Sequence, residues 1–394
     1  MIIKVGKNDA LTISDDVVKK VLNIYPEENL QERSSFAVAF QSGYIDYKVL
    51  IKESESLYIP WQMFFLTPDN LKRAIKHIED QRVDKFSPKF FTKRTGQGEV
   101  TSKRIVDRLV RLQNYIVSNS NLPINQFCGA LKGKKIDYCI QFISNYFEIN
   151  EIFFSKTKDD ALNYLIENVE SKSINVSTNA LKAGVLPEVK GVNEIYKSTS
   201  GFVIKDDRIP FIFLPNENNL DEIVARHIYT ILYLLTCIAL DDYDFYIKQN
   251  FVASAVQSRG PEAKKHEIVT GILLPREITN SLYGGSIDKE LIDSLVSIRK
   301  MTPTAILVTL KKRGIITQDE CDALMPKPYK PNNKRGGRRA KITNSVKKFC
   351  GKTALGFIEN AIRNGSIKSI QAQYLIFGRV RKKDYKTYCQ QIWI

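Results

Sequence analysis

Three histidines limit the metal and acid–base chemistry open to this chain of 394 residues: His77, His227 and His266. His227 lies in a long apolar stretch that is expected to form a buried helix. On a helix, the motif His-Glu-x-x-His places two imidazoles on one face to bind Zn²⁺, and its glutamate acts as general base on the metal-bound water. Counted from His227, the base position is occupied by Ile228 and the second ligand position by Ile231. The chain therefore carries half of a zinc motif.

The segments around His227 can be assigned to elements in order along the chain. Two β-rich runs flank the polar turn Asp206-Asp207-Arg208, which predicts a hairpin over 201–215. The stretch Asn219-Leu-Asp-Glu222 is typical of a capping box, so we expect it to open the helix that bears His227. Further helices are expected over Glu262–Pro275, 291–300 and 304–313, the last capped by Gly314.

This order of elements resembles the ImmA/IrrE family of zinc peptidase-like proteins, especially its long forms with extra helical domains. The resemblance covers roughly 160–318, and a weaker similarity over 343–390 corresponds to the family's C-terminal helical unit. Four stretches carry it: a helix leading into a first strand (164–176), the hairpin (201–214), the helix of the zinc motif (223–235) and the helix of the third zinc ligand, which closes on Leu-Leu-Pro (262–275).

The resemblance implies a role for each position of the motif. The first zinc ligand falls on His227, the general base on Ile228, the second ligand on Ile231 and the acidic third ligand on Glu262. A catalytic zinc needs three protein ligands and a water, and isoleucine cannot take up a proton. His266, one helical turn after Glu262, could replace a ligand. Alternatively, His227 and Glu262 form a buried hydrogen-bonded pair, or His227 is an ordinary histidine of an amphipathic helix.

The expected fold class is α+β and predominantly helical. A small sheet would pack on a zincin-like helical body, with extra helical domains at both ends. The expected divisions are a mixed α/β region with a basic connector (1–100), a helical bundle that could include a helix-turn-helix (101–158), the ImmA/IrrE-like domain (159–325), a basic linker (326–341) and a basic helical C-terminal unit (342–394).

Local patterns support the N-terminal divisions. The runs 35–40 and 44–51 are apolar and strand-like, and Thr67 followed by Pro68 predicts a helix start, with the helix running to about residue 79. The connector 84–99 interleaves basic residues with phenylalanines, as an interdomain linker or a nucleic-acid contact would. Residues 101–170 are expected to be helical: a helical period appears at Ile105, Leu109, Leu112 and Ile116, and further helices are expected over 124–131, 136–146 and 159–171.

The net charge of +16 is concentrated at one end of the chain. Residues 326–394 hold 17 lysines and arginines but only two acids, a net charge of +15. Such asymmetry indicates an anionic partner, most often nucleic acid, although a basic tail can also serve solubility alone. The candidate nucleic-acid-binding residues are Lys334, Arg335, Arg338, Arg339, Lys341, Arg379, Arg381, Lys382 and Lys383.

Three functions are compatible with these patterns. The first is a catalytically inactive peptidase-like regulator that binds a protein partner such as a repressor, an antitoxin or a defence component, in the mobile-element or phage setting that the resemblance implies. The second is an active zinc peptidase with an altered metal site, which uses Glu262, His266 and His227, or Glu267 as base, and cleaves such a partner. The third is a nucleic-acid-binding module that uses the basic C-terminal region. On the first reading no cofactor is expected, with zinc as the alternative.

The remaining composition indicates a cytoplasmic protein. The six cysteines form no C-x-x-C pair and no disulfide spacing, which predicts reduced thiols. No signal peptide is expected from the N-terminal residues, and the longest apolar run, 228–240, is too short to span a bilayer. We therefore expect no membrane partner.

Overall fold

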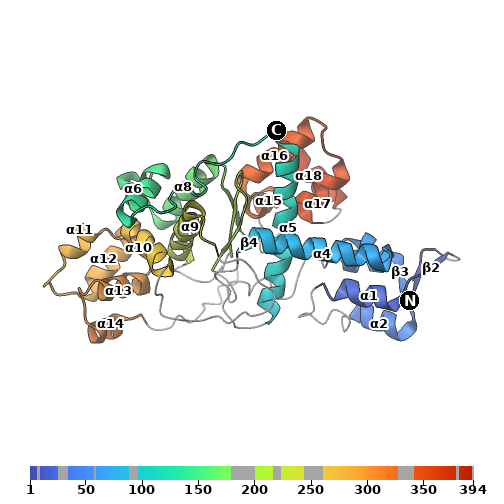
Figure 1. Cartoon of the computed structure of the whole chain (residues 1–394), viewed down its shortest axis with the longest axis horizontal. Helices are drawn as coiled ribbons and strands as arrows, with labels where there is room; N and C mark the ends of the chain where they lie inside the picture. Colours follow the sequence, from blue (N-terminus) through green and yellow to red (C-terminus); the bar gives the residue numbers. More distant parts are fainter. Residues whose placement is uncertain are drawn as a thin grey trace.

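The computed structural model describes residues 1–6, 9–24, 34–56, 59–87, 96–178, 200–215, 223–243, 261–326, 341–378 and 381–392. This part of the chain is predominantly helical, with helices α1 to α18 and two small sheets (Figure 1). The helix-rich mixed class expected from the sequence is therefore confirmed. None of the described helices combines the length and the apolar character needed to cross a membrane.

A four-stranded sheet lies between the two largest groups of helices (Figure 1). Its order is β4-β6-β7-β5, in which β7 pairs antiparallel with β6 and parallel with β5, and β4 pairs antiparallel with β6. The predicted hairpin is confirmed as β6 and β7, and the Asp206 carboxylate accepts hydrogen bonds from the N–H groups of Arg208 and Ile209 in its turn. The bounds are β4 Phe86–Ser87, β5 Asn175–Thr178, β6 Phe202–Ile204 and β7 Phe211–Leu214.

Both faces of the hairpin are buried, because apolar residues alternate between two cores. Val203, Ile212 and Leu214 belong to one core, whereas phenylalanines of β6 and β7 belong to the other. The first core is covered by α6 Ile136–Tyr146, α7 Glu151–Ser155, α8 Lys158–Ser171, α9 Ile223–Leu240, α10 Pro261–Leu273, α11 Arg276–Asn280, α12 Lys289–Arg299, α13 Pro303–Lys312 and α14 Gln318–Leu324.

The second core contains the basic C-terminal helices together with α5. Its helices are α5 Gly96–Asn119, α15 Ile342–Cys350, α16 Lys352–Arg363, α17 Ser369–Phe377 and α18 Lys382–Ile392. The buried Arg108 of α5 donates to the carbonyl of Ile376 and lies 4.0 Å from the ring centroid of Phe349. Helix α5 therefore packs with the C-terminal unit, on the opposite side of the sheet from α6 and α8.

The N-terminal unit has a core of its own, with Phe36, Leu50 and Phe64 fully buried in it. Thr67 caps α4, because the amide of Asn70 donates to its Oγ1 at 3.5 Å, as the sequence predicts. Helix α4 then runs beyond residue 79 to Lys85. The other elements are β1 Ile2–Lys4, β2 Ala10–Thr12, α1 Asp15–Leu22, α2 Ser34–Ser42, β3 Tyr44–Asp46, α3 Tyr47–Ser56, η3 Trp61–Phe65 and α4 Pro68–Lys85.

Two local predictions were wrong. The run 35–40 is helical, with Phe36 and Ala39 buried three residues apart and Val38 exposed, which is a helical and not a strand spacing. Residues 124–131 form successive turns instead of a helix. Their amides use remote acceptors, because Gly129 and Leu131 donate to carbonyls at the C-terminal end of α9 at 3.0 and 2.8 Å. The prediction for 44–51 holds only in part, since β3 is followed directly by a helix.

The start of α16 joins the C-terminal unit to β5 and α8. Its first two amides, at Lys352 and Thr353, donate to the Glu170 carboxylate at 2.6 and 3.1 Å. The third, at Ala354, donates to Oδ1 of the buried Asn175 at 2.9 Å, and Nδ2 of Asn175 donates to the carbonyl of Cys350 at 2.9 Å. Side chains from two remote elements thus satisfy amides that a helix N-terminus leaves unpaired.

We expect Asn175→Ala to lower the free energy of unfolding by about 2 kcal/mol or more, because it leaves a buried amide and a buried carbonyl without partners. The matched control is Asn360→Ala, at an exposed position within α16, which should change stability by less than about 0.5 kcal/mol. Denaturant unfolding of both variants measures the difference. Equal effects at the two positions would contradict the role given to Asn175.

Candidate functional site

The half-motif lies on α9, a helix that is buried over most of its surface. Ile228 and Ile231 are both 0% exposed and belong to the first core. His227 is 7% exposed, and its Nε2 lies 2.8 Å from the carbonyl oxygen of Pro215, directly after β7. A carbonyl oxygen can only accept a hydrogen bond, so Nε2 of His227 carries the proton and donates it.

This geometry bears on how the residues fit a zinc ion. Because Nε2 of His227 donates its hydrogen to Pro215, the ring in this arrangement could bind a metal only through Nδ1. The aliphatic side chains at 228 and 231 offer no ligand atom. Glu262 lies in the first turn of α10, but its side chain is outside the described residues. Within the described residues no cluster of three or more His, Cys, Asp or Glu could hold a metal.

His266 contacts two tyrosines of α9. Its Nδ1 lies 2.8 Å from the hydroxyl of Tyr229, and its ring centroid lies 4.9 Å from that of Tyr233. Burial raises the pKa of Tyr229, so the phenol keeps its proton and can donate it to Nδ1. The two histidines that the sequence singles out therefore have different hydrogen-bond partners. A role of His266 as a substitute ligand stays a prediction.

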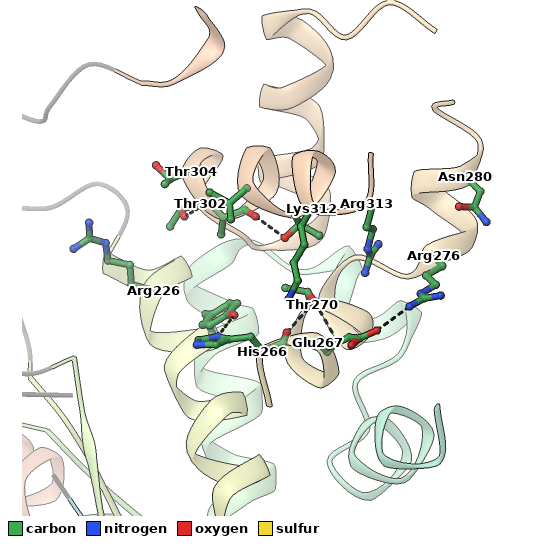
Figure 2. Close-up of a pocket in the computed structure, with 14 residues that line it drawn as sticks. Arg226, His266, Glu267, Thr270, Arg276, Asn280, Thr302, Thr304, Lys312 and Arg313 are labelled. Carbon is green, nitrogen blue, oxygen red and sulfur yellow. Dashed lines mark hydrogen bonds and ion pairs between the residues drawn. The ribbon is translucent and has the colours of Figure 1, made fainter. Parts of the chain in front are cut away.

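A pocket of about 690 Å³ lies beside these residues, between α9, α10, α11 and α13 (Figure 2). Arg226 and Tyr229 line it from α9, and His266 lines it from α10. Residues 226 and 229 lie on a different side of α9 from the isoleucines at 228 and 231, which face the core. The pocket therefore does not open onto the base and second-ligand positions of the half-motif.

The charges around the pocket are predominantly positive. Four of its lining residues are cations, namely Arg226, Arg276, Lys312 and Arg313, and the only lining carboxylate, that of Glu267, accepts a hydrogen bond from Nη2 of Arg276 at 2.8 Å. Burial first, and then the charge of Arg276, lowers the pKa of Arg313. The like charges of these side chains repel each other, and a bound anion would offset that repulsion. Such a set of cations can therefore hold an anion.

Sequence reasoning missed this set of cations. Arg226 is adjacent to His227, but the others lie 50 to 87 residues further along the chain, at Arg276, Lys312 and Arg313. No spacing rule links these positions, because only the packing of α13 and α11 against α10 brings them to one pocket. The available signal was the pair of basic residues at the end of the helix predicted over 304–313.

The structure places only some of the predicted nucleic-acid-binding residues. Lys341, Lys382 and Lys383 are exposed, whereas Arg381 is half-buried and forms an ion pair with Asp384 at 2.6 Å. The other candidates lie outside the described residues: Lys334, Arg335, Arg338, Arg339 and Arg379. The predicted capping residue Asn219, residues 88–95 of the connector and residues 327–340 of the linker also lie outside them.

The six cysteines are all free, and four of them are buried. Their redox state in solution stays a prediction from their spacing. Burial raises the pKa of Cys128 to about 12, which keeps it in the unreactive thiol form at neutral pH. We therefore assign no nucleophilic role to it.

Comparison with known proteins adds no assignment. No family model, no curated protein and no solved structure matches this chain.

We expect His227→Gln to flatten the dependence of stability on pH. Burial lowers the pKa of His227 below its usual 6.5, so in mildly acidic solution the unfolded chain binds a proton that the folded protein does not. The resulting loss of stability is absent above the unfolded pKa and grows as the pH falls below it. Urea unfolding between neutral pH and pH 5 measures this loss, which should be smaller in the variant.

The exposed His77 provides the control, and His77→Gln should keep the wild-type profile. Parallel profiles for wild type and His227→Gln would show that His227 is not held neutral in the folded protein.

Proposed function

We propose that this protein is a catalytically inactive, metallopeptidase-like regulatory protein with a zincin-like body, and that it acts by binding a partner. The observation that carries the proposal is the state of the half-motif. The positions of the general base and the second ligand are filled by isoleucines that are fully buried in the core, and Nε2 of His227 donates to the carbonyl of Pro215. A water-activating metal centre needs polar groups at these positions.

The resemblance to the ImmA/IrrE family supplies the setting for this proposal. Active members of that family regulate mobile elements by cleaving repressors or antitoxins. A protein that keeps such a body without the general base could still dock the same kind of partner without cutting it. The expected partner is therefore a repressor, an antitoxin or a defence component, met in the cytoplasm.

The C-terminal unit supports nucleic acid as a second candidate partner. Within the described residues of this unit there are two carboxylates, and both are engaged: Glu359 accepts a hydrogen bond from Tyr388 at 2.5 Å, and Asp384 pairs with Arg381. Eight lysines of this unit reach solvent, so the described surface presents mainly positive charge. The exposed lysines are Lys341, Lys347, Lys348, Lys352, Lys368, Lys382, Lys383 and Lys386.

Metal content distinguishes the inactive regulator from a zinc peptidase. After incubation with excess zinc and gel filtration, we expect the full-length protein to retain far less than one zinc per chain, because only one imidazole remains at the motif and it is already hydrogen-bonded. Elemental analysis measures the ratio in wild type and in His227→Ala. One zinc per wild-type chain that disappears in His227→Ala would overturn the proposal and favour an altered peptidase site.

Salt dependence tests the nucleic-acid candidate. If the basic unit contacts phosphates, affinity for labelled double-stranded DNA should fall with salt, with a log–log slope of about −0.9 for each phosphate contact. Lys382→Glu combined with Lys383→Glu should weaken binding and reduce that slope by about 2. The matched control reverses Lys19 and Lys20, an adjacent exposed pair on α1. Equal effects of the two double variants, or no binding at all, would exclude this partner surface.

A further inference from the structure

The pocket between α9, α10, α11 and α13 has no part in the proposed regulatory docking or in the zinc motif. It is lined by Arg226 and Tyr229, whereas the motif positions Ile228 and Ile231 lie in the core on another side of the same helix. Its volume of about 690 Å³ is within the range of sites for small molecules and too small for a folded partner. A ligand is therefore to be sought among small molecules.

The cations are distributed so that an anion could be held from several sides. In Figure 2, Lys312 extends from α13 toward Thr270 on α10, while Arg276 and Arg313 lie together at one end and Arg226 lies at the opposite end. Among the described residues that line the pocket, Glu267 is the one carboxylate, and it pairs with Arg276, while Glu277 of α11 lies close enough to raise the pKa of Arg313 against the larger lowering effect of burial. Among the described residues, Lys312 and Arg226 form no hydrogen bond or ion pair, so their charges are available to a ligand.

Arg313 is held in position before any ligand arrives. Its Nη1 donates to the carbonyl of Leu274 at 2.7 Å and to Oγ1 of Thr279 at 3.0 Å. Its Nε and Nη2 make no hydrogen bond with another described residue. A guanidinium fixed by one nitrogen loses little conformational entropy when its other N–H groups bind, and its fork matches the oxygens of a phosphate.

The opposite end of the pocket adds both polarity and an apolar surface. Thr302 and Thr304 lie at the start of α13, whose N-terminal end carries partial positive charge, and Figure 2 shows both on the side of Arg226. Ala305 and Val308 of α13 and Tyr229 of α9 contribute apolar surface to the lining of the pocket. The site thus combines several cations with an apolar surface on which an aromatic ring of a ligand could pack.

From these features we propose that this pocket binds a small phosphorylated molecule with an aromatic ring, of the nucleoside diphosphate class. The phosphates bind to Lys312, Arg313 and Arg276, and the ring lies against Tyr229 and Val308. The inference does not depend on whether the half-motif binds zinc, so the metal analysis and the binding test fail or succeed separately.

Isothermal titration of the full-length protein with ADP tests the proposal, with pyrophosphate, adenosine and citrate as comparison ligands. We expect ADP to bind more tightly than pyrophosphate, which lacks the ring. We expect adenosine, which lacks phosphates, and citrate, a carboxylate polyanion, to bind at least about tenfold more weakly than ADP, because a charge-assisted hydrogen bond contributes about 1.5–3 kcal/mol.

Two exposed neighbours on α13 provide the matched variants. Lys312→Glu reverses a charge that lines the pocket, whereas Lys311→Glu makes the same change outside it, where Lys311 bonds Gln318. We expect Lys312→Glu to lower the affinity for ADP by about tenfold or more and Lys311→Glu to lower it by less than about twofold. Thermal unfolding of both variants confirms that they fold.

Four results would overturn the proposal. They are no heat of binding with ADP or pyrophosphate, binding of citrate in preference to ADP, ADP affinity that is equal in the two lysine variants, and ADP affinity that is lost when Lys382 and Lys383 of the C-terminal unit are replaced by glutamate. The last result would assign the phosphate to the basic surface instead of the pocket.

Discussion

The burial of both faces of the β6–β7 hairpin is the constraint on which the rest of the structure depends. A short hairpin cannot remain folded in water with apolar residues on both faces, so helices must cover it from two directions. The turns over 124–131 and helices α6 to α14 cover one face, and α5 with the C-terminal helices covers the other. For this reason the basic helices α15 to α18 are part of a core of the fold, and the bonds at Asn175 join them to the sheet.

The same constraint explains the character of the half-motif. Helix α9 packs between the sheet, α8 and α10, and a helix in that place needs aliphatic residues over most of its surface. Packing in the core requires apolar side chains at positions 228 and 231, whereas metal chemistry requires polar ones. The isoleucines present at both positions satisfy the packing. The polar residues of α9 that reach a cavity, Arg226 and Tyr229, are on the side where α13 leaves space.

Sequence patterns predicted elements well where local and tertiary forces agree. The hairpin, the helices at 136–146 and 159–171 and the Thr67 cap follow from periodicity and capping residues within a few positions. They failed at 124–131, where glycines and the carbonyls at the end of α9 offer a better solution than a helix. The pocket was beyond such reasoning, because Arg226, Arg276 and Arg313 meet only through the packing of helices that are distant in sequence. Whether these residues fit a zinc ion could also not be predicted from the sequence, since only the structure shows that Nε2 of His227 contacts the carbonyl of Pro215.

The junction of the N-terminal unit has a mechanical consequence. Helix α4 is a rod of about 27 Å that continues into β4, and β4 pairs with β6 through only two residues, at the edge of the sheet (Figure 1). Helix α4 also packs against α5, which enters the core of the C-terminal helices. A force applied to the N-terminal unit would therefore reach the body at two places, strand β6 and the basic C-terminal helices around α5.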